Sequence, residues 1–144
     1  MEPHLPRSPR ADQKQKLAES EKITINLGPV DLGQVDLLVG EGFYSNRTDF
    51  IRSAIRNQIG SHAEAVRQTI ARKTLVLGIQ TFARADLERI RKAKARLRIR
   101  VLGLVRIADD VSPALARDTI ESLEVLGALH ASAAVKAALA DRIL

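Results

Sequence analysis

The feature that most constrains the fold is one short segment in which polar and apolar residues alternate, residues 22–27 with the sequence KITINL. A period of two with several β-branched residues is typical of a half-buried β-strand. Gly28-Pro29 ends the segment, because proline cannot donate to a strand ladder but suits the first turn of a helix. The residues that follow up to Gly60 contain no second strand, so the backbone groups of this one need a partner from elsewhere.

A first helix is predicted directly after the strand, from about Pro29 to Val39. Its apolar residues recur at helical spacing and fall on one face: Leu32, Val35 and Leu38/Val39. Gly33 lies inside the helix, where glycine costs roughly 1 kcal/mol relative to alanine. Glycine is common just past a helix end, so we expect the segment from Gly40 to Gly42 to stop the helix.

A second helix is predicted to open within residues 45–49. Asn46 is a favourable N-cap, and Asp49 three residues later can return the hydrogen bond as in a capping box; Ser45 with Thr48 is the alternative pair. Gly60 marks the end of this helix or a joint. The buried stripe is predicted to comprise Phe50, Ile51, Ala54, Ile55 and Ile59.

One strand and two helices within residues 22–60 are too few to build a stable core from one chain, since that limit lies at about 40 residues. The economical solution is a homodimer, in which two strands pair antiparallel about a two-fold axis. Four helices then bury Ile23, Ile25 and Leu27 beneath the paired strands.

Pairing of the two strands turns Lys22, Thr24 and Asn26 outward from each chain, because successive strand residues face opposite sides. A two-stranded ribbon fits the major groove of B-DNA, where asparagine pairs with adenine, lysine reaches guanine, and threonine meets thymine or a base edge. The start of the second helix carries free N–H groups and a positive dipole end, with Arg47 beside it, which favours phosphate binding. The pattern therefore predicts double-stranded DNA as a partner.

The stretch from Lys22 to Ile59 resembles a ribbon-helix-helix domain of the CopG/Arc/MetJ-like superfamily, and it is most similar to CopG-family regulators. The resemblance implies that Lys22, Thr24 and Asn26 contact bases, and that residues 45–48 (Ser45, Asn46, Arg47 and Thr48) hold the DNA backbone. The positions that carry it are Gly42, Phe43, Tyr44, Ser45, Arg47, Thr48, Asp49, Phe50, Ile51, Arg52, Ala54, Ile55 and Arg56.

Composition excludes several classes of function. The chain has no cysteine, so disulfides, thiol catalysis and thiolate metal sites are ruled out. Its three histidines, His4, His62 and His130, lie far apart, unlike the metal ligands of nickel-responsive regulators that share a ribbon-helix-helix domain. No catalytic motif, secretory signal or membrane-spanning run is present. We therefore expect a cytoplasmic protein without enzymatic activity, cofactor or metal.

The C-terminal half nearly repeats itself. A helix is predicted over residues 61–73, and then an aliphatic-glycine motif recurs at Gly78, Gly103 and Gly127, at spacings of 25 and 24 residues. Helices are expected between and after these strands, at about 84–96, 113–122 and 133–142. Strand-helix units of this length resemble a leucine-rich-repeat-like solenoid. The prediction is an α+β protein with a flexible tail (1–20), a ribbon-helix-helix domain (21–60) and an α/β repeat domain (61–144).

The net charge of +6 is concentrated in residues 61–100, and above all in the run from Arg84 to Arg100. A surface helix with solvated charges is the favoured interpretation of this run; extra phosphate contacts or an acidic partner are alternatives. The repeat domain is expected to self-associate into higher oligomers, or else to act as a passive stabilising or ligand-sensing domain.

The sequence as a whole predicts a sequence-specific transcriptional regulator, and more specifically a repressor. Two alternatives remain open. One is an antitoxin that binds both DNA and a toxin, although such proteins often end in a disordered arm. The other is a plasmid-partition or architectural DNA-binding protein that coats long DNA.

Overall fold

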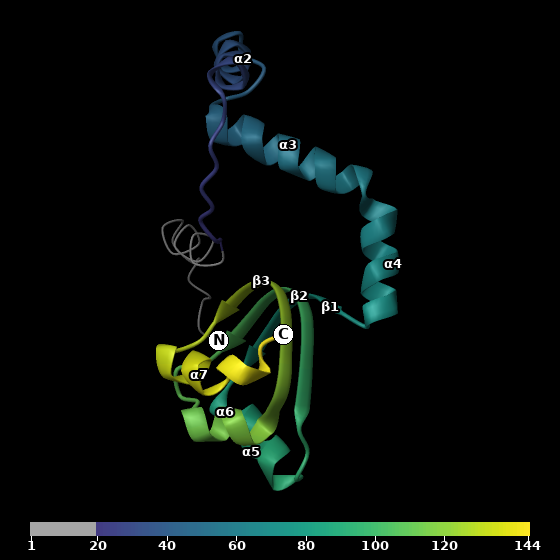
Figure 1. Cartoon of the computed structure of the whole chain (residues 1–144), viewed down its shortest axis with the longest axis vertical. Helices are drawn as coiled ribbons and strands as arrows, with labels where there is room; N and C mark the ends of the chain where they lie inside the picture. The colour runs from purple at the N-terminus through teal and green to yellow at the C-terminus, as the bar shows by residue number, and fades with distance from the viewer. Residues whose placement is uncertain (1–19) are drawn as a thin grey trace, which may run out of the picture. The chain divides into compact units, whose positions relative to one another are not determined.

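The computed structural model describes residues 20–144, and the predicted flexible tail therefore lies outside the described residues, apart from Ser20. The chain divides into two compact units, Met1–Asn57 and Gln58–Leu144. Figure 1 labels the helices and strands of both units, which are described separately below.

The first unit contains an extended segment, residues 20–28, followed by α2 (Pro29–Gly40) and α3 (Arg47–Ser61), whose last residues reach into the second unit. The predicted first helix is confirmed to within one residue at its end. Gly42 stops it with a φ of 83°, a left-handed conformation that favours glycine. The N–H groups of Gly42 and Phe43 donate to the carbonyls of Val39 and Leu38, which completes a Schellman cap.

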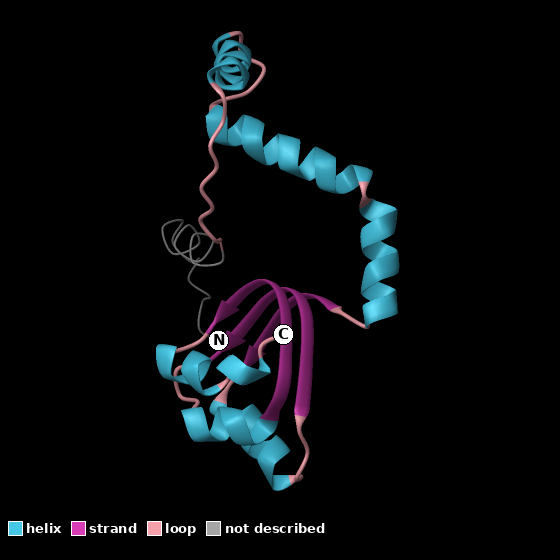
Figure 2. Cartoon of the chain, in the orientation of Figure 1, coloured by secondary structure: helices cyan, strands magenta, loops and turns pink. Residues whose placement is uncertain are grey.

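After the last residues of α3, the second unit contains α4 (Ala63–Lys73) and three strand-helix units. The strands are β1 (Val76–Phe82), β2 (Leu97–Ile107) and β3 (Ile120–His130). The helices are α5 (Arg84–Lys92), α6 (Pro113–Thr119) and α7 (Ala133–Ala138), followed by a 3₁₀ turn, η1 (Ala140–Arg142). All three strands are parallel in the order β1-β2-β3, and they arch together in Figure 2.

The α5, α6 and α7 helices pack against one face of this sheet, here called the inner face (Figure 1). The core between them is aliphatic, as the scarcity of aromatic residues requires. Its largest fully buried side chains include Leu87, Ile120, Leu123 and Leu139. On the opposite, outer face Leu77 and Leu126 are 70% and 46% exposed, and residues of α4 line a hollow together with Leu102 and Leu126.

A row of glycines crosses the sheet at one level: Gly78 pairs with Gly103, and Gly103 with Gly127. Their φ angles of 134°, 141° and 123° lie in a region that other residues rarely adopt. A Cβ atom on Gly103 would lie 2.1 Å from the carbonyl oxygen of Gly78, and one on Gly127 would lie 2.1 Å from that of Gly103. The repeated glycine is therefore required by close approach of the neighbouring strand.

The prediction of one surface helix over Arg84–Arg100 is wrong. α5 ends at Lys92, and Lys94 adopts a φ of 53° in the turn that follows. From Leu97 onward arginine alternates with aliphatic residues, a period of two that places Ile99 and Val101 in the core as part of β2. The predicted helix over 113–122 likewise ends at Thr119, because β-branched Ile120 opens β3.

Candidate nucleic-acid interface

The segment that carries the predicted base-reading residues is extended and exposed. Lys22, Thr24 and Asn26 are all accessible, and within the described chain residues 20–28 join no strand of the three-stranded sheet. The apolar residues between them are exposed too, with Ile23 at 71% and Ile25 at 54%. The segment therefore has the alternating composition of a β-strand, but its aliphatic side chains are not covered within one chain. A strand of this kind needs a second strand to pair with.

The helices beside this segment do not close a core by themselves. Among the described residues of the first unit only Val35 is buried, on α2. Large apolar side chains remain exposed on both helices and in the turn, including Val30, Leu37, Phe43 and Ile55. A single copy therefore leaves uncovered the apolar surface that would have to form the core of this unit.

The start of α3 is held by its own side chains. The backbone N–H of Asp49 donates to Asn46 Oδ1 at 2.8 Å, which confirms Asn46 as the N-cap. The Asp49 carboxylate accepts a hydrogen bond from the N–H of Ser45 at 2.9 Å, one residue before the N-cap. An edge-to-face contact of Tyr44 with Phe50, with ring centroids 5.0 Å apart, fixes the approach to the helix.

Arg47 is engaged by a partner that the sequence did not reveal. Its Nε and Nη2 atoms donate to the two carboxylate oxygens of Asp36 on α2, at 2.7 and 2.8 Å. The hydrogen bond from Arg47 lowers the pKa of Asp36 below its ordinary value, and the same bond raises the pKa of Arg47. The pair braces α2 against the start of α3, and Nη1 makes no hydrogen bond to the described residues.

Two further arginines adjoin the start of α3. A polar hollow of about 380 Å³ is lined by Ser45, Asn46, Thr48, Asp49, Arg52, Ser53 and Arg56. The structure thus brings three of the four predicted phosphate-binding residues together, and Arg47 is not among the lining residues. Arg52 and Arg56 follow Thr48 at intervals of four residues, and this spacing places all three along one side of α3.

The cap at Asn46 gives a direct test of how the helix start is held. Replacing Asn46 with alanine is expected to lower the free energy of unfolding by about 1 kcal/mol, because one N–H of the first turn loses its acceptor. Chemical denaturation followed by circular dichroism measures the loss. Asn57→Ala, at an exposed position later in α3, serves as the matched control and should cost nothing; equal stability of both variants would contradict the cap assignment.

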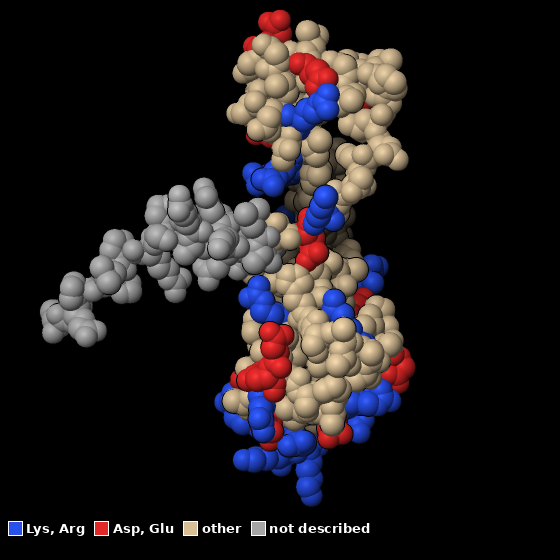
Figure 3. Space-filling view, turned by 90° about the vertical axis from the view of Figure 1, so that its left-hand side faces the viewer, with Lys and Arg blue, Asp and Glu red and all other residues tan. Residues whose placement is uncertain are grey.

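The basic run that links α5 to β2 offers less free positive charge than its composition indicates. Arg89 pairs with Asp86 at 2.6 Å, Arg98 with Glu121 at 2.9 Å and Arg100 with Glu124 at 3.0 Å. Blue side chains still gather at one end of the second unit in Figure 3. Acidic side chains of the same unit offset part of this charge, so the run is a weaker candidate for a DNA contact than the start of α3.

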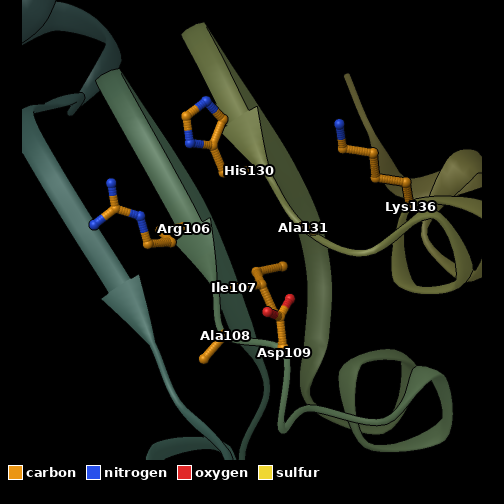
Figure 4. A pocket seen from close by; sticks show the side chains of 7 residues that line it. All are labelled: Arg106, Ile107, Ala108, Asp109, His130, Ala131 and Lys136. Carbon is orange, nitrogen blue, oxygen red and sulfur yellow. The ribbon is translucent and has the colours of Figure 1, made fainter. Parts of the chain in front are cut away.

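One hollow of the second unit lies at the carboxyl ends of β2 and β3. It measures about 380 Å³ and places Arg106 and His130, register partners on neighbouring strands, opposite Lys136 of α7 (Figure 4). Asp109 lies beside them. The hollow is open to solvent, and the carboxylate of Asp109 adjoins the positive charges of Arg106 and Lys136.

Two other features of the described residues bear on the predicted absences. The part of the chain from residue 20 onward contains no group of three or more metal-ligating side chains placed to hold an ion. None of its helices combines the length and the apolar character needed to cross a membrane.

Comparison with known proteins gives one finding, at the level of the family. No curated protein and no solved structure gives a match. Residues 18–136, which cover most of both units, match the model of a family of transcriptional regulators. The chain belongs to the Ribbon-Helix-Helix transcriptional regulator family.

Proposed function

We propose that the protein is a dimeric, sequence-specific transcriptional repressor that inserts an antiparallel ribbon, made from residues 22–27 of two chains, into the major groove. The observation that carries this proposal is the exposure of the apolar residues of this alternating segment. Ile23, Ile25 and Leu27 are exposed in one chain, and a second copy would bury them. A repressor role follows because a bound dimer occludes its site from other DNA-binding proteins.

In this proposal the DNA contacts divide into two sets. Lys22, Thr24 and Asn26 read base edges from the ribbon. Ser45, Asn46, Arg47 and Thr48 hold the phosphates through side chains and the N–H groups at the start of α3, and the neighbouring Arg52 and Arg56 add positive charge there. Phosphate contacts set the position of the ribbon, and base contacts set its specificity.

The test begins with selection of bound sites from random DNA. Asn26→Ala is then expected to weaken binding to the selected site by roughly 1–3 kcal/mol, as for one lost base contact, while binding to unrelated DNA stays the same. Fluorescence anisotropy with labelled duplexes measures both. Unchanged affinity and unchanged selectivity in this variant would show that the ribbon does not read the bases.

The contrast variant removes a phosphate contact. Arg47→Ala is combined with Asp36→Asn, so that no unpaired carboxylate remains beside the DNA. This double variant is expected to weaken selected and unrelated DNA alike, and to reduce the slope of log affinity against log salt by about 1. A loss of affinity for the selected site alone would instead identify Arg47 as a residue that contacts bases.

The C-terminal half favours this proposal over an antitoxin. Residues 76–144 form an ordered sheet with three helices and a buried aliphatic core, whereas the antitoxin alternative expects an arm that folds only on its toxin. We further propose that the three strand-helix units form a short leucine-rich-repeat-like solenoid, since their register advances by 25 and 24 residues from strand to strand. Its role in this proposal is association between dimers.

A further inference from the structure

We propose that the second unit assembles head to tail: β3 of one copy adds in parallel to the outer edge of β1 of another, so that one sheet continues from chain to chain. The inference does not rest on the DNA-binding proposal, because it concerns residues 76–144 alone and is tested without DNA. Four observations on the described residues carry it.

The first observation is Gly78. Gly103 and Gly127 must lack a side chain because the carbonyl of the preceding strand lies 2.1 Å from where a Cβ would be. Gly78 has the same left-handed backbone, with a φ of 134°, yet nothing lies within 4 Å of its own Cβ position. Gly78 thus has the backbone conformation of a residue that lies against a neighbouring strand, although a single chain places no strand on that side of β1. In the glycine row, the residue that would precede Gly78 is Gly127 of another copy.

The second observation is the fit between the two open edges. At the outer edge of β3, Ile143 bridges to Leu123 and the N–H of Leu144 donates to the Leu123 carbonyl. This contact covers the beginning of the β3 edge and leaves the edge free from Val125 onward. Val125 lies at the same level of the sheet as Val76 of β1, because both residues pair with Val101 of β2. β1 has seven residues, whereas β2 and β3 have eleven each. β1 therefore has no residue at the level of the sheet where Ile143 and Leu144 lie beside β3.

The third observation is a hollow of about 520 Å³ at the β1 end of the inner face. Its lining residues are Thr74, Val76, Gln80, Phe82, Leu97, Arg98, Ile99 and Arg100. It exists because β1 starts at the level of Val101 and leaves the first residues of β2 without a neighbour on that side. In a continued sheet, Ile143 and Leu144 of the next copy reach this level, and they are 43% and 80% exposed in one chain.

The fourth observation is the absence of protection at the edge. Natural edge strands are guarded by charged residues, proline or bulges, which oppose pairing with another chain. β1 has the sequence VLGIQTF, without a charge or a proline, and β3 reads VLGAL from Val125 to Leu129. Continuation of the sheet would extend the aliphatic row Leu77-Leu102-Leu126 from one copy into the next.

A contact of this kind joins two different surfaces, so it repeats. Each copy presents a β1 edge and a β3 edge, and the series grows until it closes into a ring or continues as a filament. Pairing of two β1 edges would be antiparallel and would stop at one contact. The two arrangements bring different residues together, and this difference can be measured.

Disulfide trapping separates them, because the full chain contains no cysteine of its own. Leu77→Cys and Leu126→Cys are made in separate full-length proteins and mixed under mild oxidation. Adjacent strands lie about 4.8 Å apart, inside the roughly 4.4–6.8 Å range of Cα distances that a disulfide spans. Head-to-tail addition predicts a two-chain product in the mixture and none in either protein alone.

The control replaces Leu126→Cys with Ser122→Cys, which lies four residues earlier on the same strand, or about 13 Å away, and should give no product. A two-chain product from Leu77→Cys alone would overturn the proposal in favour of paired β1 edges. No product from any mixture would overturn it as well.

Gly78→Ala supplies the second measurement. Its Cβ would meet only the added strand, so this variant is expected to lose the trapped product when built into the Leu77→Cys partner. In sedimentation without DNA, the wild-type protein should form species larger than a dimer as concentration rises, and Gly78→Ala should not. Equal assembly of wild type and variant would overturn the proposal. If Gly78→Ala does not fold, the trapping experiment alone decides.

Discussion

Ile25→Asp is expected to abolish dimerisation and, with it, detectable DNA binding. In the proposed dimer Ile25 faces the core beneath the ribbon, whereas in one chain it is 54% exposed, so the penalty falls on association. An uncompensated buried carboxylate costs about 3–5 kcal/mol, and a symmetric dimer contains two. A total of about 6 kcal/mol or more weakens the dimer on the order of 10⁴-fold. Analytical ultracentrifugation over a dilution series measures this change, with Gly78→Ala present in every protein compared so that association through β1 does not contribute.

Thr24→Asp is the matched control, since it places the same charge on the neighbouring residue and on the opposite face of the ribbon. This variant should remain dimeric and lose DNA binding, because its carboxylates face phosphates and base acceptors. The pair of variants tests which face of the segment is covered. A dimeric Ile25→Asp protein, or a monomeric Thr24→Asp protein, would reverse the assignment of the two faces.

Gly103→Ala is expected to destabilise the second unit by roughly 2–6 kcal/mol. Two effects add: the φ of 141° strains any residue with a side chain, and the new Cβ would lie 2.1 Å from the carbonyl oxygen of Gly78 on β1. The backbone cannot yield as a flexible side chain would. β1 must therefore shift away from β2 or the unit must open.

Hydrogen exchange read by mass spectrometry locates this loss, with peptides from β1, β2 and β3 compared with peptides from α2. Gly78→Ala, measured at concentrations too low for association, provides the comparison, because it adds the same backbone strain without a contact inside the chain. Its cost should be about 1–3 kcal/mol. If both variants lost the same stability, strain alone would account for the glycines, and the close approach of the strands would not matter.

Local signals explain what the sequence predicted correctly. The start of α2 at Pro29, its glycine stop and the Asn46 cap each depend on a few neighbouring residues. The repeat of the aliphatic-glycine motif predicted three strands, because the same short pattern recurs at nearly constant spacing. The Cβ clash explains why glycine is the repeated residue, a reason that becomes visible only when the strands lie side by side.

Contacts between distant residues explain what the sequence did not reveal. Asp36 and Arg47 are eleven residues apart on different helices, so nothing in the local pattern joins them. The arginines of residues 84–100 indicated one helix because their charge dominated the composition, while the alternation from Leu97 to Val101 was masked by it. The relation of Arg52 and Arg56 to Thr48 follows from their spacing, whereas their proximity to Ser45 and Asn46 is visible only in the folded structure.

The strands of the sheet are not equally buried. Val101 and Val105 at its centre are completely inaccessible, whereas Val76, at the level of Val101 on β1, keeps 45% of its surface in water. We therefore expect unfolding fluctuations to start from the β1 side, where the fewest contacts must break. β1 is thus the least stable of the three strands. Any contact that stabilises β1 is expected to make the whole second unit more rigid.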